Sequence, residues 1–415
     1  MKKYIFMTTS TKSAGGNQCY LAAKAKFLES EGWDVYVFCC APKPKSIHCP
    51  IESLEKYIEK GNITAMGIPP FLLPKFMANH TINRMVKVVG TRNENEECIV
   101  ESHMDVDSQW GELLAVRIGA RHYIYAMPED YRVKTPYYVP KMDFYIYKFK
   151  RHEIMGSMIT FSRLFDGYMT VSENDFPAPV LIDECPIQDV KNETVEALEK
   201  KDWNICYIGR GNKGYVPNII ADVANFAQKH SDKKLQLVFV TDSIAQYTDL
   251  LNDVKVKSKN LNIENLGMLH PIPSSLYKKI DVVIAGSGSA RHSCEEGAIV
   301  IVADPESKQS AGILGYETMN SVFRDEDSVV SDFCDALTRV LVEESYKGKE
   351  NRWPKRLGVE KCTEQNFWLF SQAEKELKYY DEKKLLEGPV DYKRIIKCYL
   401  ANYFPIILEL SGKLK

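Results

Sequence analysis

Residues 281–304 read Asp281-Val282-Val283-Ile284-Ala285-Gly286-Ser287-Gly288-Ser289-Ala290-Arg291-His292-Ser293-Cys294-Glu295-Glu296-Gly297-Ala298-Ile299-Val300-Ile301-Val302-Ala303-Asp304. Two apolar runs, at 281–285 and 298–304, flank a small-residue turn and a short segment that ends at Gly297. Neither run alternates with polar residues, which is typical of strands in a parallel sheet covered on both faces. The stretch therefore predicts a buried strand, a turn, a short helix and a second buried strand.

The turn in this stretch predicts an anion site. Its residues Ser287, Gly288, Ser289 and Ala290 follow the carboxyl end of the first strand. They are expected to leave backbone N–H groups exposed at a helix N-terminus, which favours a negative charge, usually a phosphate. A tight turn that only connects two elements explains the same residues equally well.

The beginning of the chain also alternates strand and helix. Apolar residues predict strands at 4–7 and 33–38, with a helix over 17–32 between them. Gly15 and Gly16 stand in the first turn, at a carboxyl strand end, where ligands bind in doubly wound sheets. The spacing is not that of a dinucleotide fingerprint, and no acidic residue closes the second strand. We interpret the glycine pair as a place where a ligand approaches closely, with close packing of loop on helix as the alternative.

Two further predicted strands each lead to a polar residue. His103 ends the strand at 98–103, and Glu129 follows the strand at 122–127. Both are therefore expected at the mouth of the crevice that Gly16 faces. A histidine there can donate a hydrogen bond or carry a proton near neutral pH, although a lone histidine at a strand end is more often structural. A strand over 168–173 is expected to close this first domain.

A second strand and helix series begins near residue 204. Strands are predicted at 204–209, 235–240 and within 261–269, with a helix over 217–230. The loop 209–214 holds Arg210 and Lys213 among glycines, and fixed cations beside backbone donors suit a diphosphate. A solvated basic turn is the alternative. We favour diphosphate binding because this loop and the turn at 286–290 both follow strands of one sheet.

Composition limits the classes of function. With 415 residues, 45% of them hydrophobic and 27% charged, the chain has the composition of a globular protein of two or three domains. A net charge of −2 argues against a nucleic-acid-binding surface. The 11 cysteines include no Cys-x-x-Cys pair and indicate buried thiols of a reducing compartment. No signal peptide and no run of the roughly 20 apolar residues that span a bilayer is found, so a cytoplasmic location is expected.

Two tandem doubly wound domains, with a glycine pair after the first strand, resemble the GT-B fold of sugar-nucleotide glycosyltransferases. The second half, over about residues 202–304, resembles glycosyltransferase family four. That family has a G-R…K-G segment, here Gly209-Arg210 and Lys213-Gly214, whose cations hold the donor diphosphate. It also has a nucleobase strand ending in glycine, here Leu266-Gly267-Met268. In the first half, residues 101–103 and the turn at Glu129 are similar to its acceptor-side strands, and Gly15-Gly16 matches its phosphate-facing loop.

This resemblance implies an α/β fold of two Rossmann-like, doubly wound domains that face a central cleft. Residues 1–182 would form the acceptor-side domain, and residues 183–385 would bind the nucleotide-sugar. Helices are expected over 328–344, 364–380 and 392–410. The C-terminal helix, within 386–415, would return to the N-terminal domain, with a membrane-surface helix as the competing interpretation.

The sequence also departs from the family. Its signature of two glutamates separated by seven residues falls here on Ile284 and His292, and we group His292 with the donor-binding residues. The turn at 286–290 and the segment 312–318 are closer to divergent bacterial cell-surface polysaccharide transferases. Glu317 in that segment is a candidate for the carboxylate that touches the donor sugar, beside His103 and Glu129. A cap or turn role for Glu317 is equally compatible with its position.

The resemblance implies a retaining hexosyltransferase that takes a sugar from a UDP- or GDP-linked donor. The acceptor would be a glycan, undecaprenyl-linked, in the synthesis of a surface polysaccharide such as a capsule. Fixed cations and amides would stabilise the leaving diphosphate, so no metal and no cofactor is required. Aromatic and basic residues at 131–150 suit peripheral contact with the inner face of the membrane, or else form a solvated loop or helix.

Three other functions stay open. A sugar-nucleotide 2-epimerase shares this two-domain shape, but its Asp-Ser-Gly-Gly turn is matched here by Gly286-Ser287-Gly288-Ser289, which lacks the aspartate. A catalytically silent GT-B partner that only binds glycan would account for the missing glutamates. A peripheral membrane-binding module would use the aromatic and basic stretch together with the C-terminal tail.

Overall fold

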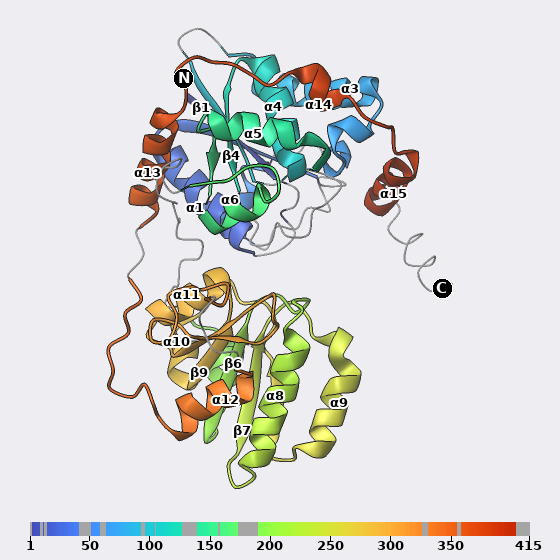
Figure 1. Cartoon of the computed structure of the whole chain (residues 1–415). Helices are drawn as coiled ribbons and strands as arrows, with labels where there is room; N and C mark the ends of the chain where they lie inside the picture. The colour runs from blue at the N-terminus through green and yellow to red at the C-terminus, as the bar shows by residue number, and fades with distance from the viewer. Residues whose placement is uncertain are drawn as a thin grey trace. The chain divides into compact units, whose positions relative to one another are not determined.

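The computed structural model describes residues 2–8, 11, 15–40, 51–58, 64–92, 96–103, 105–126, 139–156, 158–172, 190–325, 331–354 and 358–403 (Figure 1). Glu129 lies outside these residues. The chain forms two compact units, the first from Met1–Glu184 together with Leu357–Lys415 and the second from Cys185–Arg356. Each unit is an α/β structure built on its own sheet, as the alternation of apolar runs and amphipathic segments predicts.

The first unit contains a five-stranded parallel sheet in the order β2-β1-β3-β4-β5. Its strands are β1 Lys2–Thr8, β2 Trp33–Cys39, β3 Glu97–Ser102, β4 Arg121–Tyr125 and β5 Ile154–Met155. Its helices before the second unit are α1 Gly16–Ser30, α2 Glu52–Glu55, α3 Lys75–Val89, α4 Asp105–Ile118, α5 Met142–Lys150 and α6 Met158–Leu164, with 3-10 turns η2 Thr64–Gly67, η3 Pro70–Leu72 and η4 Val139–Lys141. Residues Tyr4 to Met7 of β1 are fully buried, so the sheet is covered on both faces.

The strand expected over 168–173 is wrong. The last strand of this sheet is β5, whose Ile154 and Met155 are buried beside β4. Residues 168–172 instead follow α6 as a turn in which the N–H groups of Tyr168 and Met169 donate to the carbonyl of Phe165. The edge of the sheet beside β4 is occupied by the shorter strand β5.

Helix α5 also differs from the expected aromatic surface. Its Phe144, Tyr145 and Phe149 are buried in the core of the unit, and Lys148 is buried with them. Residues 131–138 lie outside the described part of the chain. The described half of this aromatic stretch therefore packs mostly inward, and of its aromatic side chains only Tyr147 is half-buried.

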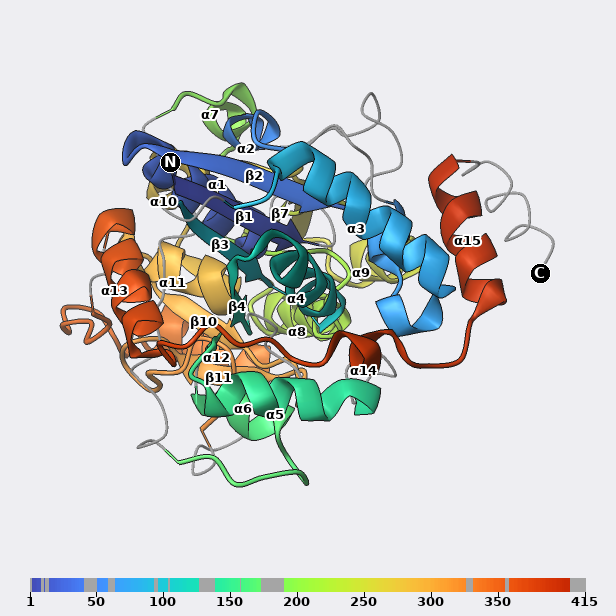
Figure 2. The same cartoon turned by 90° about the horizontal axis from the view of Figure 1, so that it is seen from above.

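The C-terminal segment returns to the first unit, as the fold class predicts. Helix α13 Val359–Gln372 packs on α1. Its Phe367 stacks on Trp33 of β2, with ring centroids 5.5 Å apart. It is followed by α14 Glu382–Leu386 and α15 Tyr392–Tyr403, and α15 lies beside η2 on the side that carries α3 (Figures 1 and 2). The return begins at α13, earlier in the chain than the residue 386 expected.

The helix expected over 364–380 ends at Gln372. Beyond it the backbone crosses the unit in an extended form, because side chains of the unit bind its polar groups. Arg121 donates to the carbonyls of Glu374 and Lys375, and Arg151 donates to that of Glu376. Local helical pattern is thus overridden by long-range hydrogen bonds.

The second unit contains a six-stranded sheet in the order β11-β10-β9-β6-β7-β8. The strands are β6 Trp203–Ile208, β7 Leu235–Val240, β8 Leu261–Asn265, β9 Val282–Ala285, β10 Val300–Ala303 and β11 Ser310–Ile313, and only β11 is antiparallel to its neighbour. The helices are α7 Glu193–Ala197, α8 Val216–Lys229, α9 Thr248–Lys257, α10 Ser274–Lys279, α11 Ser287–Glu295 and α12 Phe333–Leu337, with η6 Ala245–Tyr247 and a π-helical turn η7 Thr338–Val342. The strand, turn, helix and strand predicted for 281–304 are confirmed.

In both sheets the strand order reverses on the two sides of the first strand, which is β1 in the first unit and β6 in the second. In the first unit the chain passes from β1 to β2 on one side and then to β3 on the other. In the second unit it passes from β6 through β7 to β8, and then to β9 on the opposite side of β6. A crevice at the carboxyl ends of the strands forms at such a switch point, which is where ligands bind in open α/β sheets. The candidate ligand positions are therefore the ends of β1 and β3, and those of β6 and β9.

None of the helices in the described ranges is long and apolar enough to cross a membrane.

Candidate functional site

Three loops of the second unit meet at its switch point. Strands β6 and β9 are neighbours whose ends, Ile208 and Ala285, lie opposite each other. A Cβ placed on Gly286 would lie 3.3 Å from the carbonyl oxygen of Ala303 and 3.4 Å from the hydroxyl of Tyr215. Tyr215, where the loop after β6 ends, and Ala303, the last residue of β10, therefore lie beside Gly286, the first residue after β9, so the end of the loop at 209–214 lies near the start of the turn at 286–290.

The loop after β6 is held tightly by its neighbour after β7. The N–H of Gly211 donates to Asp242 Oδ1 at 3.1 Å, and its carbonyl accepts from Gln246 at 2.9 Å and from the Tyr247 hydroxyl at 2.9 Å. A Cβ on Gly211 would lie 1.8 Å from the carbonyl oxygen of Ser243, so only glycine fits there. These contacts fix the backbone of the loop at Gly211, so the loop is a platform for its exposed side chains.

A recess borders the same loop. It has a volume of about 420 Å³, is open to solvent, and is lined by Asn212, Asp242, Ser243, Gln246 and Tyr247. Burial raises the pKa of Asp242, but hydrogen bonds from the Gly211 N–H and the Thr241 hydroxyl outweigh it and leave that pKa below its usual value. The Asp242 carboxylate is thus ionised near neutral pH and fixes the loop.

Arg210 and Lys213 occupy this platform. The Arg210 carbonyl accepts a 2.8 Å hydrogen bond from the Tyr207 hydroxyl, which passes beneath Gly209. A Cβ on Gly209 would lie 2.7 Å from that hydroxyl. The Arg210 side chain is exposed and makes no ion pair with any residue that the structure describes. Its charge is available to an anion at the switch point, and Lys213 lies three residues further along the loop.

The first turn of α11, which follows the neighbouring strand β9, supplies backbone donors at the same end of the sheet. Ser287 has a left-handed φ of 56°, and its N–H donates to the carbonyl of Ser321 at 2.6 Å. The next two N–H groups, of Gly288 and Ser289, have no acceptor among the described residues, as expected for a helix start. Ala290 and His292 are buried on the inner side of α11. The turn therefore offers amides from 288 and 289, while His292 is part of the packing of the unit.

Two other predicted residues lie elsewhere in the second unit. Met268 follows β8, is 43% exposed, and stands two strands away from β6. Glu317 follows β11, and because β11 is antiparallel its end lies at the opposite edge of the sheet. The Glu317 carboxylate accepts from Arg339, Tyr346 and the N–H of Ile313. Glu317 therefore joins β11 to η7, which is a structural role.

At the switch point of the first unit, Gly15 caps α1 and His103 follows β3. The N–H of Gly15 donates to the side chain of Gln18 at 3.2 Å, and α1 begins at Gly16. His103 is fully buried, and its Nε2 contacts Glu101 Oε1 at 2.8 Å. Its Nδ1 has no hydrogen-bond partner among the described residues. Because a carboxylate only accepts, Nε2 carries the proton, and Nδ1 of a neutral ring offers a lone pair.

Sequence reasoning missed the buried ion pair that supports His103. Lys24 Nζ lies 2.6 Å from Glu101 Oε2, and neither side chain is exposed. Burial opposes ionisation of Glu101, but the charge of Lys24 and the hydrogen bonds from His103 and Lys24 outweigh it and hold the pKa of that carboxyl well below its usual range. Asn366 of α13 accepts from Lys24 at 2.6 Å. A lysine in an amphipathic helix pattern gives no sign of burial, so the sequence carries no signal for this pair.

A second buried network lies between β4, α4 and α5. His122 Nδ1 donates to Glu112 at 2.7 Å, and Lys148 lies 2.7 Å from the same carboxylate. Ser102 Oγ lies 2.9 Å from His122 Nε2. Burial, and then the charge of Lys148, lower the pKa of His122 to about 4 although Glu112 acts to raise it. This histidine is therefore neutral at physiological pH and belongs to the fold.

No group of three or more histidine, cysteine, aspartate or glutamate side chains that could hold a metal ion occurs in the described parts of the chain.

No model of a known protein family matches the chain, and no curated protein matches it. Solved structures do resemble it. The HepE protein of Anabaena in complex with UDP-glucose is 12% identical, with 89% of this chain and 99% of that one covered and a TM-score of 0.59. A glycosyltransferase from Rickettsia africae is 13% identical, with 97% and 99% covered and a TM-score of 0.54.

A UDP-GlcNAc 2-epimerase from Neisseria meningitidis bound to UDP-GlcNAc is also similar, at 13% identity, with 90% of this chain and 100% of that one covered and a TM-score of 0.53. The fold is GT-B-like. At these identities the likeness establishes the architecture of the chain and nothing about its chemistry. The predicted fold class, with two Rossmann-like units and a returning C-terminal segment, is confirmed in this GT-B-like chain.

Proposed function

We propose that this GT-B-like chain is a glycosyltransferase that takes a sugar from a nucleotide-sugar donor whose diphosphate binds on the second unit. The observation that carries the proposal is the approach of Tyr215, at the end of the loop after β6, to Gly286, at the start of the turn after β9. Arg210 and Lys213 stand on the first of these loops, which Asp242 fixes, and the amides of Gly288 and Ser289 belong to the second. Cations and unused amides at one place are the groups that recognise a diphosphate.

The same groups would act in the chemical step. When the glycosidic bond of the donor breaks, negative charge develops on the departing diphosphate. Donors that are already oriented stabilise this charge without reorganising, which is the largest contribution in many enzymes. The hydrogen bonds that hold Gly211 keep the loop in place, so the cations do not have to be ordered again on binding.

The nucleotide is proposed to be uridine diphosphate. Support comes from the likeness in fold to proteins whose structures contain UDP-glucose or UDP-GlcNAc. The finer features follow the resemblance to glycosyltransferase family four: retention of configuration, a lipid-linked glycan acceptor, a surface polysaccharide as product and peripheral membrane contact. His103, with a lone pair on Nδ1, is proposed to act on the acceptor side, and Gly15 and Gly16 to face a phosphate.

A second candidate is a UDP-sugar 2-epimerase, because several of the similar structures are such enzymes. The two functions predict different products from the donor alone. A transferase without acceptor hydrolyses the donor slowly to free sugar and UDP, whereas an epimerase converts it to the C2 epimer with the nucleotide still attached. Incubation with UDP-GlcNAc and UDP-glucose, followed by chromatography of the products, separates them. Absence of both products, with UDP bound, indicates a binding protein.

The diphosphate assignment is tested with Arg210→Ala. Calorimetric titration with UDP should show at least about tenfold weaker binding, since a hydrogen-bonded charge contributes about 1.5 to 3 kcal/mol. The melting temperature should stay near that of the parent because the side chain is exposed. Lys257→Ala, which removes a cation from an exposed pair with Asp253 on α9, is the matched control and should leave the affinity unchanged. Equal affinity for UDP in Arg210→Ala and the parent would remove the assignment.

A further inference from the structure

The turn between β10 and β11 is held by a set of hydrogen bonds centred on Asp304. Asp304 is 3% exposed, and its carboxylate accepts from the N–H groups of Glu306 and Ser307 and from the Ser307 hydroxyl. Its N–H donates to the carbonyl of Gln309, and its carbonyl accepts from the N–H of Lys308 at 3.0 Å. Every polar group of Asp304 is used to hold the turn, so the next residues are presented in one conformation.

Lys308 is the residue that this turn presents. Its φ of 60° is left-handed, which is unfavourable for lysine and persists only where surrounding contacts impose it. Those contacts include Asn218 of α8, whose side chain donates to the Lys308 carbonyl at 2.9 Å. The backbone of Lys308 is thus tied both to its own turn and to the helix that follows the loop at 209–214.

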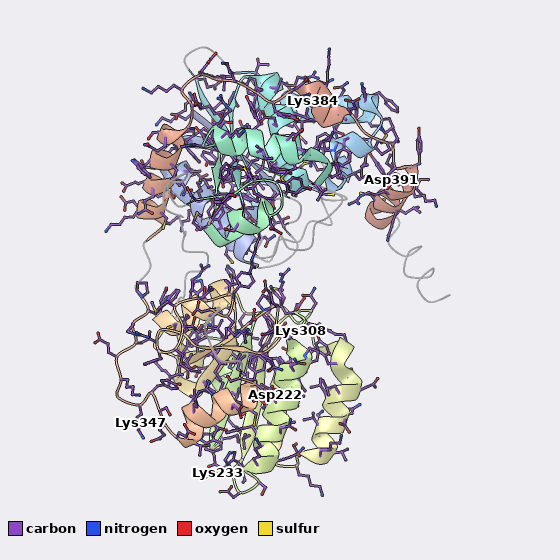
Figure 3. The ribbon with its side chains drawn as sticks, in the orientation of Figure 1. Asp222, Lys233, Lys308, Lys347, Lys384 and Asp391 are labelled. Carbon is purple, nitrogen blue, oxygen red and sulfur yellow. The ribbon has the colours of Figure 1, made fainter. Side chains whose placement is uncertain are left out.

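The Lys308 side chain extends over that loop. Its Cε lies 3.5 Å, and its Cδ 4.0 Å, from the position that a Cβ on Gly214 would take. The aliphatic stem therefore crosses Gly214, one residue beyond Lys213. Figure 3 shows Lys308 at one end of the second unit and Lys233 at the other. The end that carries Lys308 is the carboxyl edge of the parallel strands, because the turn follows β10.

No carboxylate of the described residues neutralises the charge of Lys308. The side chain is exposed, and its ammonium group forms no ion pair with a carboxylate in the described parts of the chain. The acidic residues nearest in sequence are Asp304, whose oxygens are saturated within the turn, and Glu306, which is exposed and has other contacts. Without a carboxylate partner among the described residues, and held by its backbone over a glycine loop that carries two other cations, Lys308 is placed to meet an anion from solution.

We propose that Lys308 is a third phosphate-binding cation of the donor site, acting with Arg210 and Lys213 on the diphosphate of the nucleotide. The inference rests on the proposed function and extends the site to a third loop, the one after β10. Arg210 approaches from the β6 side and Lys308 from the β10 side, with the first turn of α11 between them in the sheet order. The occupant is a nucleoside diphosphate, because one phosphate would not need cations from both sides of α11.

The test compares Lys308→Ala with Lys233→Ala in titrations of UDP, UMP and uridine. Lys233 is an exposed lysine at the amino edge of the same sheet and serves as the matched control. Lys308→Ala should bind UDP about 5- to 10-fold more weakly than the parent, UMP with a smaller loss, and uridine without change. Lys308→Arg should restore most of the affinity for UDP, and the loss should shrink as salt is raised. Circular dichroism melting should not distinguish the variants.

The outcomes separate this inference from the proposed function. If Arg210→Ala weakens UDP binding and Lys308→Ala does not, the inference is overturned and the proposed function stands. Equal losses for UDP and uridine in Lys308→Ala would also overturn it, because the lysine would then act on the nucleoside. If the parent protein binds neither UDP nor GDP, the proposed function fails, and the inference fails with it.

Discussion

The sharpest prediction concerns Gly211→Ala. A Cβ at this position would lie 1.8 Å from the carbonyl oxygen of Ser243 and 3.0 Å from its carbonyl carbon. Carbon and oxygen atoms that are not bonded approach to about 3.3 Å, so the loop must move by roughly 1.5 Å. The obstacle is backbone and cannot swing away as a side chain would. The substitution therefore displaces the platform that carries Arg210 while adding only one methyl group.

The size of the effect follows from the contacts that this movement breaks. Gly211 takes part in three hydrogen bonds, with Asp242, Gln246 and Tyr247, at 3.1, 2.9 and 2.9 Å. At about 1 kcal/mol each, their loss lowers the free energy of unfolding of the second unit by about 2 to 3 kcal/mol. For a unit of this size the melting temperature should fall by roughly 5 to 10 °C. A displacement of more than 1 Å should weaken UDP binding by about 10- to 100-fold.

Gly214→Ala provides the control in the same loop. Its Cβ would meet only the stem of Lys308, at 3.5 Å, which is ordinary contact with a flexible side chain. Melting followed by circular dichroism and titration with UDP should show little change for Gly214→Ala and large changes for Gly211→Ala. Equal melting temperatures for the two variants would refute the geometry of the loop. A destabilised Gly211→Ala protein that binds UDP like the parent would refute the location of the site.

Two further predictions test residues that the structure assigns to the fold. Because His122 has a folded pKa of about 4 and an unfolded value near 6.5, only the unfolded chain gains this proton as pH falls between these values. The free energy of unfolding should drop by at most about 3 kcal/mol as the pH falls through that window. Urea titrations at several pH values should show that this free energy depends less steeply on pH in His122→Asn than in the parent. The same pH dependence in both proteins would contradict the buried neutral state of His122. Glu317→Gln should lower the melting temperature by a few degrees through loss of its charged hydrogen bonds to Arg339, and leave the affinity for UDP unchanged. If Glu317→Gln instead binds UDP several-fold more weakly at an unchanged melting temperature, Glu317 belongs to the donor site and not to the fold.

The sequence predicted the parts of the fold that depend on short apolar runs. The run at 281–285 and the run at 298–304 became β9 and β10, because residues buried on both faces leave no other stable arrangement for such segments. The small-residue turn between them became the N-terminus of α11, with Gly286 as the residue that precedes the helix. Errors arose where distant groups compete, as at 373–380, whose carbonyls are bound by Arg121 and Arg151 and not by a helical ladder.

For the candidate site, chain order alone placed Arg210, Lys213 and the turn at 286–290 at carboxyl strand ends, since each follows an apolar strand directly. Chain order could not place Lys308, which is separated from Gly214 by 94 residues and meets it only because β10 lies two strands from β6. Nor could it show that Glu317 stands at the opposite edge, since that depends on the antiparallel direction of β11. Local pattern determines which segments are strands and which residues end them. Only the tertiary structure decides which of those ends meet, because strand order and direction are set by packing between residues far apart in the chain.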